Sequence, residues 1–120
     1  MASQLEVPAP GEFLYSEASG EYSRDNITLV SGAGLLPAGR ILGKITASGK
    51  YQSYNVANTP VGTGTAAGVL YAEVDATSAD MPAVMISRTA EVVSARISAA
   101  SGGDKAAGIT SLAAIGVIAR

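Results

Sequence analysis

A chain of 120 residues, 48% of them hydrophobic, is long enough to bury a single core, which commonly holds about 100 to 150 residues. The formal net charge is −2 and the eight basic residues are scattered, which argues against a patch for the phosphates of nucleic acid. Because the sequence contains neither Cys nor His, it lacks the commonest nucleophile, general base and soft metal ligands. We therefore predict no enzymatic activity, no cofactor and no metal site.

Residues 1–20 come first and are rich in Pro, Gly and polar side chains, which do not favour a helix or a central strand. We predict a flexible, extended N-terminal arm over 1–20 and a single β-rich domain over 21–120. The most apolar cluster of the arm is Phe13, Leu14 and Tyr15. Two interpretations of this cluster remain open: it folds onto the chain's own core, or it docks on a partner.

Short extended runs separated by turn residues follow from Asn26 onward, and this spacing is typical of an all-β domain. The runs are 27–30, 41–46, 51–56, 68–74, 83–88 and 91–97. In the fourth run Leu70, Ala72 and Val74 share one parity, so we expect one continuous strand with these residues on one face.

The last segment has a different pattern. Ser101 to Asp104 offers a helix start, and Ile109, Leu112 and Ala113 follow at helical spacing. We predict one short helix over about 105–114 and a final strand over 117–119. No run approaches the roughly 20 apolar residues that a membrane helix needs, and the N-terminus lacks the pattern of a signal peptide, so we expect neither a membrane span nor secretion.

Three constellations invite a chemical interpretation, and each has a simpler one. Residues 62–67 match the spacing of a dinucleotide fingerprint, but a strand-like run follows where a helix is needed, so we predict a surface loop. The oxygens of 75–80 do not have the spacing of an EF-hand, and a turn between strands explains them. Glu73 and Asp75 would share one face of a strand, where solvated charges are the simpler interpretation.

Several weak motifs, taken in order, resemble the bacteriophage head decoration protein family of the lambda type. The matching segments are Gly11-Glu12-Phe13-Leu14-Tyr15-Ser16-Glu17-Ala18, Ser23-Arg24-Asp25, Leu36-Pro37-Ala38-Gly39-Arg40-Ile41-Leu42-Gly43, Gly49-Lys50-Tyr51, residues 68–76, Arg88-Thr89-Ala90-Glu91-Val92, and Leu112-Ala113-Ala114-Ile115-Gly116-Val117-Ile118. Some relatives carry a Trp-Pro pair where this chain has Ser98-Ala99-Ala100, so contacts made by that aromatic ring are not carried over.

The resemblance implies a β-clip-like fold, all-β with one short C-terminal helix and a flexible arm. It implies a homotrimer at the local three-fold positions of the expanded head, which cements the outer capsid surface of the virion against DNA pressure. Its partners would be the major capsid protein and its own copies, with no nucleic acid and no membrane, and assembly would take place in the host cytoplasm. The candidate anchoring side chains in the arm are Leu5, Val7, Phe13, Leu14 and Tyr15.

Three other classes of function are compatible with parts of the sequence. An oligomeric phage tail protein shares short strands and Gly-rich turns. A glycan-binding module on the virion surface would need an aromatic platform, for which Tyr51, Tyr54 and Tyr71 are available. A hydrolase or isomerase that relies only on carboxylates would have to use groups such as Glu73 and Asp75.

Overall fold

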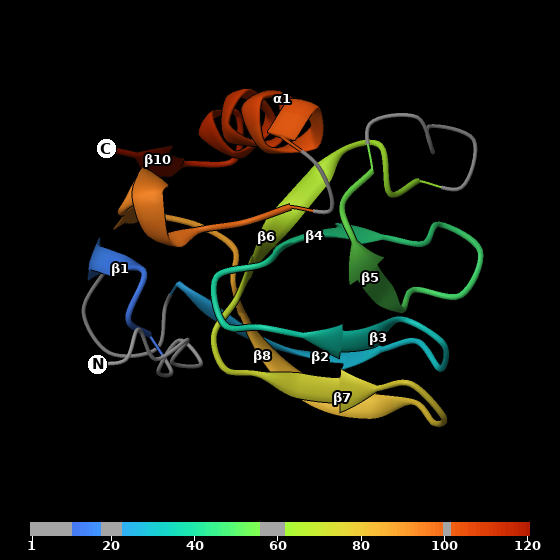
Figure 1. Cartoon of the computed structure of the whole chain (residues 1–120). Helices are drawn as coiled ribbons and strands as arrows, with labels where there is room; N and C mark the ends of the chain where they lie inside the picture. The colour runs from blue at the N-terminus through green and yellow to red at the C-terminus, as the bar shows by residue number, and fades with distance from the viewer. Residues whose placement is uncertain (1–10, 18–22, 56–61, 100–101) are drawn as a thin grey trace.

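The computed structural model describes residues 11–17, 23–55, 62–99 and 102–120, and Figure 1 shows their arrangement. Short strands predominate, and one α-helix lies near the C-terminus. The elements are β1 (Leu14–Glu17), β2 (Arg24–Leu29), β3 (Gly34–Leu36), β4 (Ile41–Lys44), β5 (Tyr51–Ser53), β6 (Ala66–Leu70), β7 (Val74–Ala76), β8 (Met81–Ile86), β9 (Ala90–Val92), the 3-10 turn η1 (Ser94–Arg96), α1 (Gly102–Ala113) and β10 (Val117–Ala119). The predicted fold class, all-β with one short C-terminal helix, is confirmed.

Five strands close into a barrel in the order β2-β5-β4-β6-β8. The longest pairing joins β2 to β8, antiparallel, from Arg24 opposite Ile86 to Leu29 opposite Met81. Two smaller sheets complete the domain: β3 pairs with β7, and β1, β9 and β10 form a three-stranded sheet with β9 in the middle. In Figure 1 β1, β10 and the C-terminus lie on one side of the barrel, away from the tip of the β3–β7 ribbon.

Two clusters of buried side chains lie on opposite faces of the barrel strands β4, β6 and β8, and each cluster takes residues from all three strands. The barrel cluster consists of Ile27, Leu29, Leu36, Leu42, Leu70, Ala76 and Met85. The helix-side cluster consists of Phe13, Ile41, Tyr54, Ala66, Val69, Ile86, Ala90, Val92, Ile97, Leu112 and Val117. Because successive side chains of a strand point to opposite faces, neighbours such as Leu70 and Val69 fall into different clusters. β4 and β6, and the end of β8 at Met85 and Ile86, are therefore buried on both faces.

The helix α1 closes the helix-side cluster, where Figure 1 shows it beside β6 and β10. Leu112 of α1 is fully buried in this cluster. Gly108 permits a close approach, since a Cβ at this position would lie 2.9 Å from Cδ1 of Ile41. The helix runs from Gly102 to Ala113, so it begins earlier than the predicted 105–114, and the predicted strand over 117–119 is β10.

Two predicted strands are interrupted. The run 68–74 is divided between β6 and β7, because the chain bends after Leu70 and β7 pairs with β3 instead of continuing in the barrel. Leu70 belongs to the barrel cluster and Val74 packs against it, so both side chains face the same core. The apolar alternation therefore continues across the bend, although the strand pairing in the barrel ends there. The run 91–97 is β9 followed by the turn η1, which brings Ile97 back into the helix-side cluster.

Candidate functional site

Part of the predicted arm belongs to the folded body. β1 lies at one edge of the three-stranded sheet and pairs antiparallel with β9, with an irregularity between Leu14 and Ser16. β10 lies on the other side of β9, in parallel register. A backbone hydrogen bond of 2.7 Å from the N–H of Val93 to the carbonyl of Phe13 extends the pairing. Residues 11–17, which we predicted in the arm, are therefore attached to the domain.

The candidate anchoring residues have three different environments. Phe13 is 1% exposed and packs in the helix-side cluster, as expected for the interpretation in which this part of the arm folds onto its own core. Leu14 is half-buried against the same cluster. Tyr15 is 65% exposed and contributes apolar surface beside β9. Leu5 and Val7 lie outside the described residues.

Two contacts fix the start of the described segment. The N–H of Gly11 donates to the carbonyl of Tyr71 at 2.9 Å. Gly11 has a φ of +71°, and a Cβ there would lie 2.9 Å from Cε1 of Tyr71, so both the backbone conformation and the close ring favour glycine. The next residue, Glu12, forms an ion pair with Arg96. The chain thus joins the body at Gly11 and Glu12.

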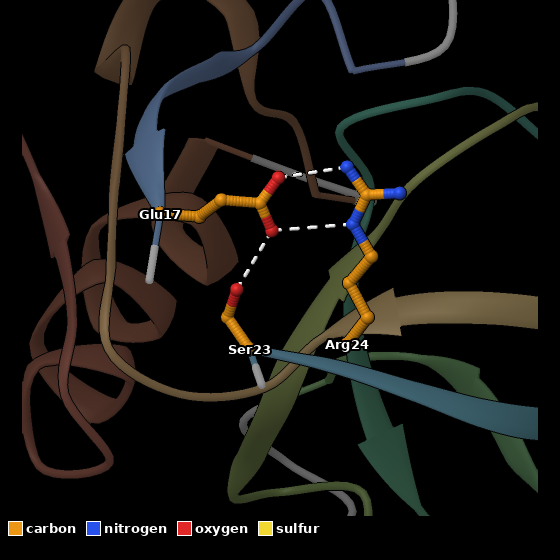
Figure 2. Close-up of polar contacts among 3 residues, drawn as sticks. All are labelled: Glu17, Ser23 and Arg24. Carbon is orange, nitrogen blue, oxygen red and sulfur yellow. Dashed lines mark hydrogen bonds and ion pairs between the residues drawn. The ribbon is translucent and has the colours of Figure 1, made fainter. Parts of the chain in front are cut away.

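The end of β1 is tied to β2 by a polar network, shown in Figure 2. The carboxylate of Glu17 accepts hydrogen bonds from Ser23 Oγ at 2.7 Å, from Arg24 Nε at 3.2 Å and from Arg24 Nη2 at 2.7 Å. The guanidinium of Arg24 also lies 4.4 Å from the ring centre of Tyr71, in cation–π geometry. Hydrogen bonds from Arg24 hold the pKa of Glu17 below its usual value, and Glu17 in turn raises the pKa of Arg24.

The outer face of the three-stranded sheet is mixed in character. Glu91 accepts from Ser16 Oγ at 3.0 Å and from Arg120 Nη2 at 2.7 Å, and the pKa of Glu91 is lowered mainly by Arg120. Ile118 is 38% exposed beside it. A shallow pocket of about 350 Å³ includes Glu17, Glu91 and Ile118 in its lining. Satisfied ion pairs beside exposed apolar side chains suit contact with another macromolecule better than the activation of a small substrate.

The candidate carboxylate pair does not form a catalytic arrangement. Glu73 is exposed in the bend before β7, so it does not share a strand face with Asp75. One oxygen of Asp75 accepts from the backbone N–H of Thr77 at 3.0 Å and from its Oγ1 at 2.5 Å. These bonds lower the pKa of Asp75, with the side-chain bond first. Asp75 therefore stabilises the predicted turn between β7 and β8.

The other two constellations are also structural. Residues 62–65 lead into β6 and not into a helix, so the helical half of a dinucleotide fingerprint is missing. This loop is not wholly at the surface as predicted, since Thr63 is fully buried and a Cβ on Gly43 would lie 2.7 Å from its Cα. Across the described ranges no three Asp or Glu side chains gather as a metal site would require. No helix in those ranges is long and apolar enough to cross a membrane.

The tyrosines proposed for a glycan platform are dispersed. Tyr54 is 2% exposed in the helix-side cluster, Tyr51 packs against the barrel cluster, and Tyr71 lies beneath Arg24.

The sequence did not reveal the network of Glu17, Ser23 and Arg24, because no regular element relates these positions before the chain folds.

Comparison with protein families places this chain beside a known family. The model of a family described as bacteriophage lambda head decoration protein D matches residues 3–117. The comparison with curated proteins found no match, and the comparison with solved structures found none either.

Proposed function

Because this chain belongs to the bacteriophage lambda head decoration protein D family and decorates a phage capsid, we propose that it binds the shell as a homotrimer through three N-terminal arms. The trimer occupies local three-fold positions of the expanded head and strengthens the shell against the pressure of packaged DNA. Its partners are the major capsid protein and two further copies of itself. Nucleic acid and membrane take no part, and assembly on the head takes place in the host cytoplasm.

The observation that carries this proposal is the attachment of residues 11–17 to the edge of the three-stranded sheet. Gly11, Glu12 and Glu17 each contact the body, so the segment before Gly11 starts from a defined position. An extended segment with alternating apolar residues such as Leu5 and Val7 adds a strand to an exposed sheet edge, where main-chain hydrogen bonds supply affinity. Tyr15, exposed on β1, adds apolar contact at the base of the arm.

Three arms on one trimer give strong attachment from modest individual contacts. Once the first arm is bound, the other two act at a high effective concentration, so avidity can exceed the single-arm affinity by about 10² to 10⁴. Internal pressure must then break several attachments together. The family is structural, and the proposed role requires no catalysis.

Truncation tests the arm. Deleting residues 1–10 spares Phe13, whereas a longer deletion through residue 15 would also remove a core residue and part of β1. We expect the shortened protein to remain a folded trimer in analytical ultracentrifugation and to lose binding to empty expanded heads in co-sedimentation. The full-length double variant Leu5→Ser, Val7→Ser should also lose binding, while Gln4→Ser should not.

Undiminished binding by the shortened trimer would overturn the arm mechanism. A full-length protein that is monomeric at the concentrations at which it binds heads would overturn the trimer.

A further inference from the structure

Arg40 differs from the other arginines of the chain in its partners. Four arginines each pair with a carboxylate of the described chain: Arg24 with Glu17, Arg88 with Asp25, Arg96 with Glu12, and Arg120 with Glu91. Arg40 instead donates from Nε to Ser98 Oγ at 3.1 Å and from Nη1 to Ser53 Oγ at 3.3 Å. Within the described residues, no carboxylate pairs with it and its Nη2 has no acceptor.

This guanidinium is also partly withdrawn from water. Arg40 is half-buried immediately before β4, where it forms an isolated β-bridge with Ser98, and burial lowers the pKa of Arg40. Two neutral hydroxyl groups do not offset the charge of a desolvated cation, whereas a carboxylate does so with two parallel hydrogen bonds. The segments that follow its neighbours in sequence, 56–61 and 100–101, contain no Asp or Glu. The arginine is therefore prepared for an acidic group from elsewhere.

A pocket of about 270 Å³ adjoins Arg40 through Ser98, which lines it. Pro37, Ala38, Ile97 and the exposed Ala95 form the apolar part of its lining, and Arg96, paired with Glu12, forms a polar part. Glu12 lines the same pocket. Since Gly11 and Glu12 are where the arm joins the body, Arg40 and the pocket are continuous with the surface from which the arm leaves.

We propose that Arg40 and the adjoining pocket bind an acidic segment of the major capsid protein, with a carboxylate on the guanidinium and a neighbouring apolar side chain in the pocket. This inference rests on the proposed function and adds to it a second contact, on the rigid body of the domain. The positive charge of Arg40 favours a carboxylate as its partner. Because Arg40 and the pocket lie on the surface from which the arm leaves, and the arm is proposed to bind the shell, that carboxylate belongs to the major capsid protein.

Charge removal tests the contact. Arg40→Gln should weaken binding to empty expanded heads about 10- to 100-fold, the range for losing a charge-assisted hydrogen bond, while thermal stability and trimer mass stay unchanged. Lys44→Gln is the matched control, because Lys44 is an exposed cation at the end of the adjoining strand β4 and forms no ion pair in the described chain. Ala95→Glu tests the pocket independently, since a further, unpaired carboxylate in its lining should repel the acidic segment and weaken binding as well.

Four results would overturn the proposal. Arg40→Gln and Ala95→Glu could bind heads as tightly as the wild type. Arg40→Gln could dissociate the trimer, which would assign the carboxylate to a second copy of the chain. Glu6→Gln or Glu21→Gln could weaken head binding as much as Arg40→Gln does, with no further loss when the two substitutions are combined. That result would show that the carboxylate bound by Arg40 comes from the same chain. Finally, wild-type protein that does not bind heads at all would refute the proposed function itself, whereas retained arm-dependent binding in Arg40→Gln would refute only this contact.

Discussion

The barrel and the edge strand β1 beside it are held in place by different forces. The barrel cluster is made of aliphatic side chains and Met85, with Leu29, Leu42 and Leu70 fully buried. The edge strand β1, in contrast, is fixed largely by polar contacts, such as that of Glu17 with Arg24. Buried apolar area supplies most of the free energy of folding, and half-exposed ion pairs supply little. The barrel thus provides stability, while the polar contacts determine where the N-terminal segment lies.

Phe13 is the exception that tests this division, because it joins the N-terminal segment to the helix-side cluster. Phe13→Ala should lower the free energy of unfolding by about 3 to 5 kcal/mol through lost burial and the cavity that remains. Chemical denaturation of the purified protein measures this change. If the variant unfolds like the wild type but fails to bind heads, Phe13 is a docking residue and its packing in the cluster is not its main role.

Leu70 measures the contribution of the barrel itself. Leu70→Ala should cost about 2 to 5 kcal/mol, since the side chain is fully buried. Leu35→Ala provides the control, because Leu35 is 59% exposed on β3 and its loss should change the stability by no more than about 0.5 kcal/mol. Equal effects of the two substitutions in urea denaturation would remove the contrast between barrel and periphery.

Glu17 measures the contribution of the polar contacts. Glu17→Gln should cost about 1 kcal/mol at neutral pH, because the ion pair with Arg24 is only partly buried. The pKa of Glu17 is lowered in the folded protein, so its ionised form favours folding above the ordinary value of 4.5, and this contribution is lost as the pH falls through the folded pKa. The stability difference between wild type and variant should therefore shrink between pH 7 and pH values well below 4.5. A difference that does not change with pH would show that the charge of Glu17 contributes nothing.

Tyr15 should have the smallest effect on stability and a clear effect on binding. Its side chain is 65% exposed, so Tyr15→Ser should change the free energy of unfolding by no more than about 0.5 kcal/mol. The same variant should bind expanded heads more weakly if Tyr15 supplies apolar contact at the base of the arm. Thr110→Ser, at an exposed position of α1, is a control that should alter neither property.

The regular features of the fold could be predicted from residue patterns. The central residues of most barrel strands, the final strand and the C-terminal helix could be predicted from alternation, turn residues and helical spacing. The division of 68–74 could not be predicted, because Leu70 and Val74 keep their parity across the bend and face one cluster. β3 was missed because its three residues, Gly34–Leu36, are too few for a pattern and depend on pairing with β7.

The candidate site could be predicted in part. The apolar character of Phe13, Leu14 and Tyr15 marked them out, but composition does not reveal which of three consecutive residues turns inward. That depends on the pairing of β1 with β9 and the irregularity between Leu14 and Ser16, which arise only in the folded chain. Arg40 was one basic residue among eight in the sequence, and its lack of a carboxylate became visible only when the other arginines had been paired.

The double burial of β4 and β6 limits where foreign peptides can be displayed on this protein. Inserting one residue in such a strand would send each side chain beyond it to the opposite cluster, and neither cluster has room for the exchange. The turns over 46–49 and 77–80 are exposed throughout and have no such constraint. Epitopes or affinity tags grafted there should leave the domain folded, which makes these turns the natural sites for engineering decorated particles.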